Sequence, residues 1–316
     1  MVRFESLLNA RWVSCVSSSG SKFVIWVALI GNSVISIIKF TAAFISGSSA
    51  MLSEGIHSLV DTGNQVLLLY GIKRAAKPAD ENFPFGHGKE IYFWSFVVAI
   101  SIFAVGAGVS IYEGIHHLRN PRPLGSMTMN YIVLGLAFVF EAFVWLFAVK
   151  EFKRVKGNHG FLDAVKRSKD PSLFVVLFED TAALLGLLVA LAGIYLGDVH
   201  DIWWADGGAS VAIGLILAGT AVWLAYETKG LLIGEAASPE EVKGIRDLAN
   251  VVDGIEHVNE VLTMHMGPDY VLVNLSVDFD NEVPAGQVEE TIAALDSAIK
   301  QRYPVVKRVF VEIESR

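Results

Sequence analysis

His57 and Asp61 lie four residues apart within a long apolar stretch, Met51 to Tyr70, whose sequence is MLSEGIHSLVDTGNQVLLLY. On a helix this spacing places the imidazole and the carboxylate on one face, one turn apart. A charged group at membrane depth costs about 2.5 kcal/mol or more, so it indicates a functional site. An imidazole beside a carboxylate is half of a tetrahedral site for a divalent metal. The pair therefore predicts metal binding; the alternative is a polar contact that joins two helices.

Two further carboxylates, Glu179 and Asp180, interrupt a second hydrophobic run, 174–186 (FVVLFEDTAALLG). Adjacent residues are about 100° apart around a helix, so one of the two can face His57 and Asp61 while the other points elsewhere. Two carboxylates alone in lipid are unfavourable, whereas an imidazole and a 2+ ion nearby would stabilise them. The two runs together predict a metal site within the membrane.

Such a site also suggests a mechanism. Metal ligands must be deprotonated, so metal binding releases protons and protonation expels the metal. Histidine titrates near neutral pH. A site that holds either a metal or protons is what a proton-coupled antiporter needs, with His57, Asp61 and Asp180 as the groups that couple to protons.

The composition indicates a membrane protein with an acidic, soluble tail. The chain has 316 residues, of which 53% are hydrophobic and 18% charged, whereas ordinary soluble domains carry about 25% charged residues. From Glu235 to the end there are 16 acidic and 7 basic residues, and the remainder has 17 and 18, so the net charges are −9 and +1. A nucleic-acid partner, which needs a basic face, is excluded. Cys15 is the single cysteine, which excludes a disulfide framework within the chain.

Six segments are long enough to cross a bilayer, which takes about 20 mostly apolar residues. They lie near residues 22–46, 50–72, 91–117, 128–150, 172–197 and 203–227. Basic residues gather between the second and third spans and between the fourth and fifth, so these connections are expected to be cytoplasmic, together with both termini. We expect a cytoplasmic lead-in at 1–21, without a cleavable signal peptide, and an all-α six-helix transmembrane bundle at 22–230. The bacterial inner membrane is the default location.

The tail, residues 235–316, reads as a compact cytoplasmic α/β domain. Ser238, Pro239 and Glu241 are typical of a helix start. A strand is expected at 257–266, a second at 270–279 with alternating apolar residues, a helix at 286–302 and a last strand at 305–313. The order αββαβ predicts a ferredoxin-like or similar two-layer domain.

Several other polar residues have simpler interpretations. Glu141, in the fourth span, is expected to hydrogen-bond to a neighbouring helix, and His87 to be structural in a tight turn flanked by glycines. We expect solvated roles for Asp206 and Glu227, and places at the membrane interface for His116 and His117.

At this point the motifs resemble those of the cation diffusion facilitator family of metal transporters. Residues 48–62 (SSAMLSEGIHSLVDT) are similar to the family's first metal-binding helix, and residues 83–94 (FPFGHGKEIYFW) to its cytoplasmic segment before the third span. The resemblance covers nearly the whole chain. It implies a homodimer joined by the tail domains.

The resemblance also implies a ligand set, with two residues at i and i+4 from the second span and two from the fifth. His57 and Asp61 match the first pair and Asp180 the second position of the other pair, while its first position, usually His or Asp, falls on Val176. The fourth ligand is then Glu179, another polar residue such as Asn32 or Asn64, or a water. The sequence LFED resembles a branch that includes a mitochondrial zinc transporter of animals. The family's further zinc site in the tail would have to use His257, His265, Glu312 and Glu314.

These observations favour a proton-coupled antiporter that exports a divalent transition metal, Zn²⁺ first, by alternating access. Mn²⁺, Fe²⁺, Co²⁺ and Ni²⁺ stay open as substrates. A non-transporting metal sensor or scaffold is the alternative, because Val176 replaces a ligand. An intramembrane metalloprotease would usually need a His-Glu-x-x-His helix; the sequence contains none, so we expect no enzyme. The expected partners are the bilayer, the metal, protons and a second copy of the chain, with no resident cofactor.

Overall fold

The computed structural model describes residues 26, 29–120, 127–156 and 169–315. They form two compact units, one within Met1–Ile72 and Phe93–Thr228 and the other within Lys73–Tyr92 and Lys229–Arg316. The expected lead-in at 1–21 lies outside the described residues.

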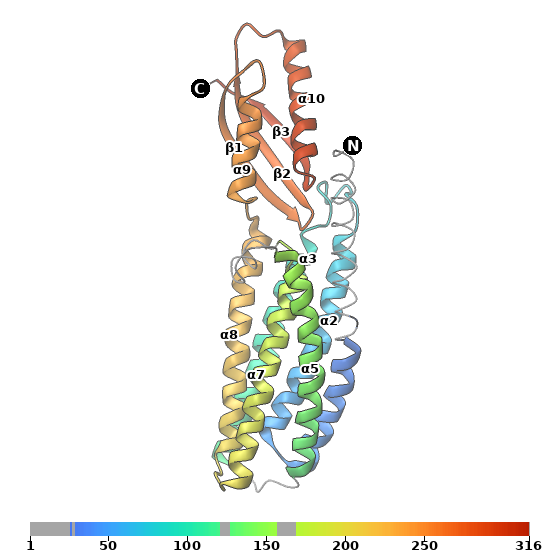
Figure 1. Cartoon of the computed structure of the whole chain (residues 1–316), viewed down its shortest axis with the longest axis vertical. Helices are drawn as coiled ribbons and strands as arrows, with labels where there is room; N and C mark the ends of the chain where they lie inside the picture. Colours follow the sequence, from blue (N-terminus) through green and yellow to red (C-terminus); the bar gives the residue numbers. More distant parts are fainter. Residues whose placement is uncertain (1–25, 27–28, 121–126, 157–168, 316) are drawn as a thin grey trace. The chain divides into compact units, whose positions relative to one another are not determined.

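The first unit consists of long helices that run side by side (Figure 1). They are a helix that includes Leu29–Ser46, α2 (Ser49–Ala75), the continuous series α3 (Glu90–Ser101), η1 (Ile102–Ala107) and α4 (Gly108–Arg119), then α5 (Met127–Lys156), α7 (Pro171–Val199) and α8 (Ala205–Ile233). From α2 on, each coincides within a few residues with one of the predicted segments, except that α5 and α8 continue about six residues further; of the first predicted segment, 22–46, residues 22–25 and 27–28 lie outside the described residues.

Five of these helices are long and apolar enough to cross a membrane: Leu29–Ser46, Glu90–Arg119, Thr128–Lys153, Phe174–Val199 and Ala205–Ile233. The helix α2, predicted as the second span, is not among them. Its 27 residues would extend about 40 Å at 1.5 Å per residue, so length is not what excludes it. It carries many polar side chains instead, and its buried residues include Glu54, His57, Asp61, Asn64 and Gln65. Its polar groups therefore face neighbouring helices.

Two features set the packing of α4. The residues before it, Ile102–Ala107, form a π-helical stretch inside the third predicted span, a geometry that often occurs at functional sites. Beyond it, α4 approaches α8 closely. A Cβ atom on Gly114 would lie 2.7 Å from the carbonyl oxygen of Gly207, so glycine is required for this contact, as is common between membrane helices.

Asp206, expected to be solvated, is 1% exposed, so that prediction was wrong. Its carboxylate, at the start of α8, accepts hydrogen bonds from the Ser49 backbone N–H at 2.7 Å, the Ser49 hydroxyl at 2.8 Å and the Ser48 hydroxyl. The Ser49 N–H is one of the backbone groups that the N-terminus of α2 leaves without an intrahelical partner, and a carboxylate there also suits the helix dipole. A residue of α8 thus caps α2, and His117 Nε2 lies 3.8 Å from the same carboxylate.

The second unit contains the tail domain, and its order αββαβ is confirmed. The elements are α9 (Pro239–Asn250), β1 (Ile255–Gly267), β2 (Tyr270–Phe279), α10 (Ala285–Arg302) and β3 (Val306–Ile313). The sheet has the order β1-β2-β3, with β2 antiparallel to β1 and parallel to β3. The parallel pair requires a crossover, which α10 supplies.

The core of this domain follows the predicted alternation of β2. Its members on one face are all buried: Val271, Val273, Leu275, Val277 and Phe279. They pack against Ile245 of α9 and against Leu295 and Ile299 of α10. The predicted helix start is also confirmed, because Ser238 and Glu241 form a capping box.

The segment 73–92 belongs to the second unit. His87 is 6% exposed, and its Nε2 lies 2.9 Å from Asp80 Oδ2, which agrees with the structural role expected for it. Gly86 has a φ of +83°, a conformation that glycine adopts readily. The ring of Phe85 packs edge-on against Phe310 of β3 with centroids 6.4 Å apart. The hydrogen bond from His87, with one from the Phe83 backbone, holds the pKa of Asp80 below its usual range.

Candidate metal centre

His57 and Asp61 both lie on the buried face of α2. They are 1% and 4% exposed, and His57 Nδ1 lies 3.2 Å from Asp61 Oδ1, as the i, i+4 spacing predicts. The contact is not aligned as a hydrogen bond, and neither ring nitrogen has a hydrogen-bond partner among the described residues. An imidazole nitrogen without a partner is a potential metal ligand.

Glu179 of α7 interacts with Asp61 of this pair. Its buried carboxyl interacts electrostatically with the Asp61 carboxyl, and its Oε1 accepts a hydrogen bond of 2.6 Å from Asn64 Nδ2. Two buried carboxylates that interact repel each other when both are ionised, so that either one of them takes up a proton or the pair binds a cation. The group of Asp61 and Glu179, with His57 one turn away, is therefore the part of the first unit most suited to exchange a cation for protons.

The other candidates are Asp180, Val176, Asn32 and Asn64. Asp180 is buried and interacts electrostatically with Asp61 and Glu179, and its Oδ2 has no hydrogen-bond partner among the described residues. Val176 is 1% exposed and lies one turn before Asp180 on α7. Asn32 is buried, and Asn64 orients Glu179 rather than Asp61. Within the described ranges, no three His, Cys, Asp or Glu side chains converge as ligands of one ion.

Among the described residues of the tail, the candidates His257, His265, Glu312 and Glu314 do not converge on one ion either. His265 is buried at the end of β1, with Nδ1 3.5 Å from the Gly267 carbonyl oxygen. Asn259 and Ser276 contact Glu314, through its main chain and its side chain respectively. These contacts do not bring the four side chains together.

Sequence reasoning missed Lys39, which lies in the first predicted span. Its Nζ donates hydrogen bonds to Glu54 Oε2 at 2.9 Å, to Glu141 Oε1 at 2.9 Å and to Ser58 Oγ at 3.0 Å. Lys39 is completely buried, so the contact joins the first helix to α2 and α5 inside the unit. The hydrogen bond expected from Glu141 to a neighbouring helix is thereby found. The available signal was a lysine in the middle of an apolar helix, which calls for an inward partner.

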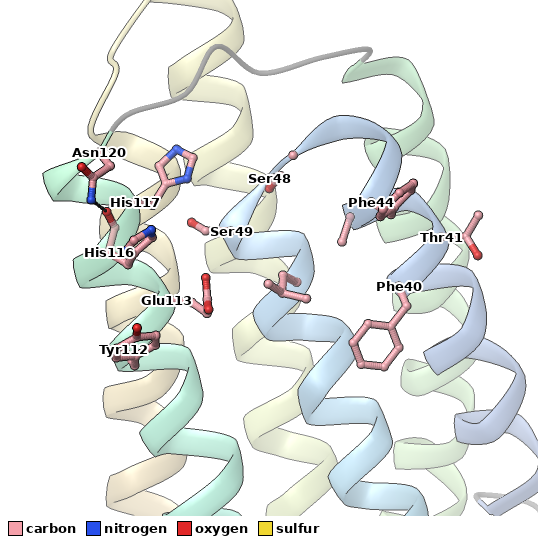
Figure 2. A pocket seen from close by; sticks show the side chains of 13 residues that line it. Phe40, Thr41, Phe44, Ser48, Ser49, Tyr112, Glu113, His116, His117 and Asn120 are labelled. Atoms are coloured by element: carbon pink, nitrogen blue, oxygen red, sulfur yellow. Dashed lines mark hydrogen bonds between the residues drawn. The ribbon is translucent and has the colours of Figure 1, made fainter.

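A cavity of about 900 Å³ lies elsewhere in this unit. Figure 2 shows Tyr112, Glu113, His116 and His117 along α4, with Ser48 and Ser49 at the start of α2. Phe40, Thr41 and Phe44 of the first helix also line it. None of His57, Asp61, Glu179 and Asp180 is among the described residues that line this cavity. It is therefore separate from the candidate metal centre.

Two family models match the chain. The cation efflux transmembrane domain matches residues 25–233, and the cation efflux protein cytoplasmic domain matches residues 237–316. The chain therefore belongs to the cation efflux family, the cation diffusion facilitators, which are metal transporters and not enzymes.

Among individual relatives, the mouse protein named proton-coupled zinc antiporter SLC30A9, mitochondrial, is 34% identical over 277 residues, which is 87% of this chain and 49% of that protein. The cation-efflux pump FieF of Escherichia coli is 24% identical over 273 residues, 86% of this chain and 85% of that protein. This chain spans about half the length of its SLC30A9 relatives. A solved structure of MamM-CTD aligns at 21% identity with a TM-score of 0.23, covering 25% of this chain and 100% of that one.

Proposed function

We propose that this chain carries a divalent transition-metal ion, Zn²⁺ in the first place, across a membrane in exchange for protons, by alternating access. The observation that supports it is the buried group of His57, Asp61 and Glu179, which joins α2 to α7 inside the helical unit. Two buried carboxyls that interact hold either a proton or a cation, and ligand protonation and metal binding exclude one another. The name of the SLC30A9 relatives supports the same exchange and the same metal.

The proposed ligands are His57, Asp61, Asp180 and Glu179, with His57, Asp61 and Asp180 as the proton-coupled groups. Asn64 would hold Glu179 toward Asp61 through its hydrogen bond of 2.6 Å. A site with one imidazole and several carboxylates suits Zn²⁺ and also admits Mn²⁺, Fe²⁺, Co²⁺ and Ni²⁺.

We further propose that α2 is the sixth membrane span and that both termini lie on the cytoplasmic side. The domains would then be a lead-in at 1–21, the membrane domain at 22–230 and the tail at 235–316, in the bacterial inner membrane by default. The match to the family's cytoplasmic domain supports a homodimer joined by the tails. Light scattering on the full chain would then report twice the 34.4 kDa of one copy.

The test is metal uptake into proteoliposomes with an imposed pH gradient, scanning Zn²⁺, Mn²⁺, Fe²⁺, Co²⁺ and Ni²⁺. Asp61→Ala and Asp180→Ala should each abolish proton-driven uptake while the protein still folds. Glu289→Ala, at an exposed position of α10, is the control and should transport normally. Uptake at the wild-type rate in either of the first two variants would refute the site assignment.

A sensor or scaffold that binds metal without moving it is the second candidate. It is favoured by Val176, an apolar residue at the position where the family usually has a ligand, and by the lack of a converged three-ligand group among the described residues. The same vesicles separate the two functions, because a sensor would bind metal but take none up.

A further inference from the structure

The buried ammonium of Lys39 is fully satisfied. A lysine has three N–H donors, and the three acceptors are Glu54, Glu141 and Ser58, at 2.9, 2.9 and 3.0 Å. Nζ therefore occupies the centre of a cage of oxygens supplied by α2 and α5. A cation at this point balances carboxylates that are 0% and 7% exposed.

Each of the two glutamates still has one oxygen without a hydrogen-bond partner among the described residues, Glu54 Oε1 and Glu141 Oε2. The side chain of Glu54 packs against α7 at Gly186, where an added Cβ atom would lie 2.5 Å from Glu54 Oε1. Glu54 is also on the same helix as His57 and one turn away from it. An uncompensated pair of glutamates here would be an all-oxygen site for a divalent cation, close to the candidate metal centre.

We propose that Lys39 is a tethered counter-cation that keeps Glu54 and Glu141 from binding metal, and so confines the transported ion to the group that contains His57. The inference rests on the proposed function, because it concerns the metal preference of the same membrane domain. A site that contains an imidazole favours a borderline-soft metal such as Zn²⁺, whereas an all-oxygen cage favours hard ions such as Mn²⁺. Lys39 is thus a specificity-determining residue that does not touch the metal.

The experiment measures equilibrium binding of Mn²⁺ and of Zn²⁺ to the full chain purified in detergent. Lys39→Met removes the charge and keeps the length of the side chain, and it should gain one Mn²⁺ per chain over the wild type. Lys39→Arg keeps the charge and should show no gain. Adding Glu54→Gln and Glu141→Gln to Lys39→Met should remove the gained ion, which would place it in the cage.

A monodisperse Lys39→Met protein that binds no additional Mn²⁺ would overturn the inference. If that variant does not fold, Lys39→Gln, which can still hydrogen-bond in the cage, serves for the same measurement. Glu141→Gln in the presence of Lys39 gives a further check: the number of bound Zn²⁺ ions should stay the same, and a lost ion would show that Glu141 is itself a ligand.

The outcomes separate the inference from the proposed function. If the wild type binds Zn²⁺ and Lys39→Met gains no Mn²⁺, the result contradicts only the inference about Lys39. A wild-type protein that binds no divalent metal contradicts the proposed function, while a gained Mn²⁺ in Lys39→Met would still support the counter-cation.

Discussion

Glu179 and Asp180 are neighbours in the sequence with different surroundings. The 100° step between them allowed one of the two to face His57 and Asp61, and spacing alone did not decide which. Glu179 accepts a hydrogen bond from Asn64 of α2, whereas Asp180 Oδ2 has no hydrogen-bond partner among the described residues. The choice depends on how α7 is rotated against α2, which packing between helices sets.

Lys39 shows a second limit of reasoning from spacing. Its partner Glu141 is 102 residues away in the chain, so no local pattern joins them. The pair His57 and Asp61 was predictable because both residues are on one helix. To predict contacts between helices, one must know how each helix is rotated about its axis. In a membrane, buried polar groups and small residues fix this rotation.

Position 176 offers a test of the site at the residue scale. Val176→His adds an imidazole at i, i+4 from Asp180, so zinc affinity should rise by about tenfold, which corresponds to about 1.4 kcal/mol. Titration calorimetry of the purified chain measures it. Val175→His, at a neighbouring buried position about 100° around the helix, is the matched control and should not tighten binding. An unchanged affinity in Val176→His would mean that this position does not face the site.

Asp80 predicts a pH dependence in the segment 73–92. Its pKa is lowered by the His87 and Phe83 hydrogen bonds, so the contact stabilises the fold above the unfolded-chain value of about 3.9. This stability is lost as the pH falls through the lower folded pKa. Cleavage of the segment by pepsin should therefore accelerate on acidification below about pH 4. In Asp80→Asn this acceleration should be weaker, and an identical pH profile would contradict the role given to Asp80.

At the scale of elements, apolar length and caps predicted most helices and strands. The capping box of α9 and the alternation of β2 are local signals, and both were confirmed. The π-helical stretch Ile102–Ala107 was not predicted, because its composition is that of any apolar helix. The cap of α2 by Asp206 was missed for another reason: the carboxylate comes from α8, 157 residues from Ser49.

The contact between α4 and α8 predicts a loss of stability on adding one methyl group. In Gly114→Ala the new Cβ would lie 2.7 Å from the Gly207 carbonyl oxygen, and such overpacking costs about 1–3 kcal/mol. The thermal melting temperature in detergent should fall. Gly135→Ala on α5, where a Cβ would meet nothing within 4 Å, should melt no lower than the wild type. Equal melting of the two variants would contradict the close approach of the helices.

At the scale of the whole molecule, composition predicted a membrane part and an acidic α/β tail, because hydropathy and charge are summed over long stretches. The number of membrane spans is harder to predict from the composition. The helix α2 carries the polar groups of the candidate site, and these lower its hydropathy, so the helix most important for the proposed function resembles a membrane span least.

Six spans place both termini on one side of the membrane, and this can be measured. Cys15 is the single cysteine and reports on the N-terminus, while Ser315→Cys in a Cys15→Ser background reports on the C-terminus. After expression in bacteria, a membrane-impermeant maleimide should label both sites in inverted vesicles and neither in right-side-out vesicles. Labelling of the two termini from opposite sides would show an odd number of spans.

The π-helical stretch before α4 has a consequence for the history of the chain. Because a π turn holds one residue more than an α turn, deleting one residue within Ile102–Ala107 would restore an uninterrupted α-helix and leave the helix after it facing nearly the same way. Gly114 would then still face Gly207, whereas deletion of one residue from the α-helical part between them, Gly108–Glu113, would turn Gly114 away by about 100°. The loss of a single residue is therefore tolerated at this point of the helix, and relatives that lack the extra residue are expected to keep small residues at the contact between α4 and α8.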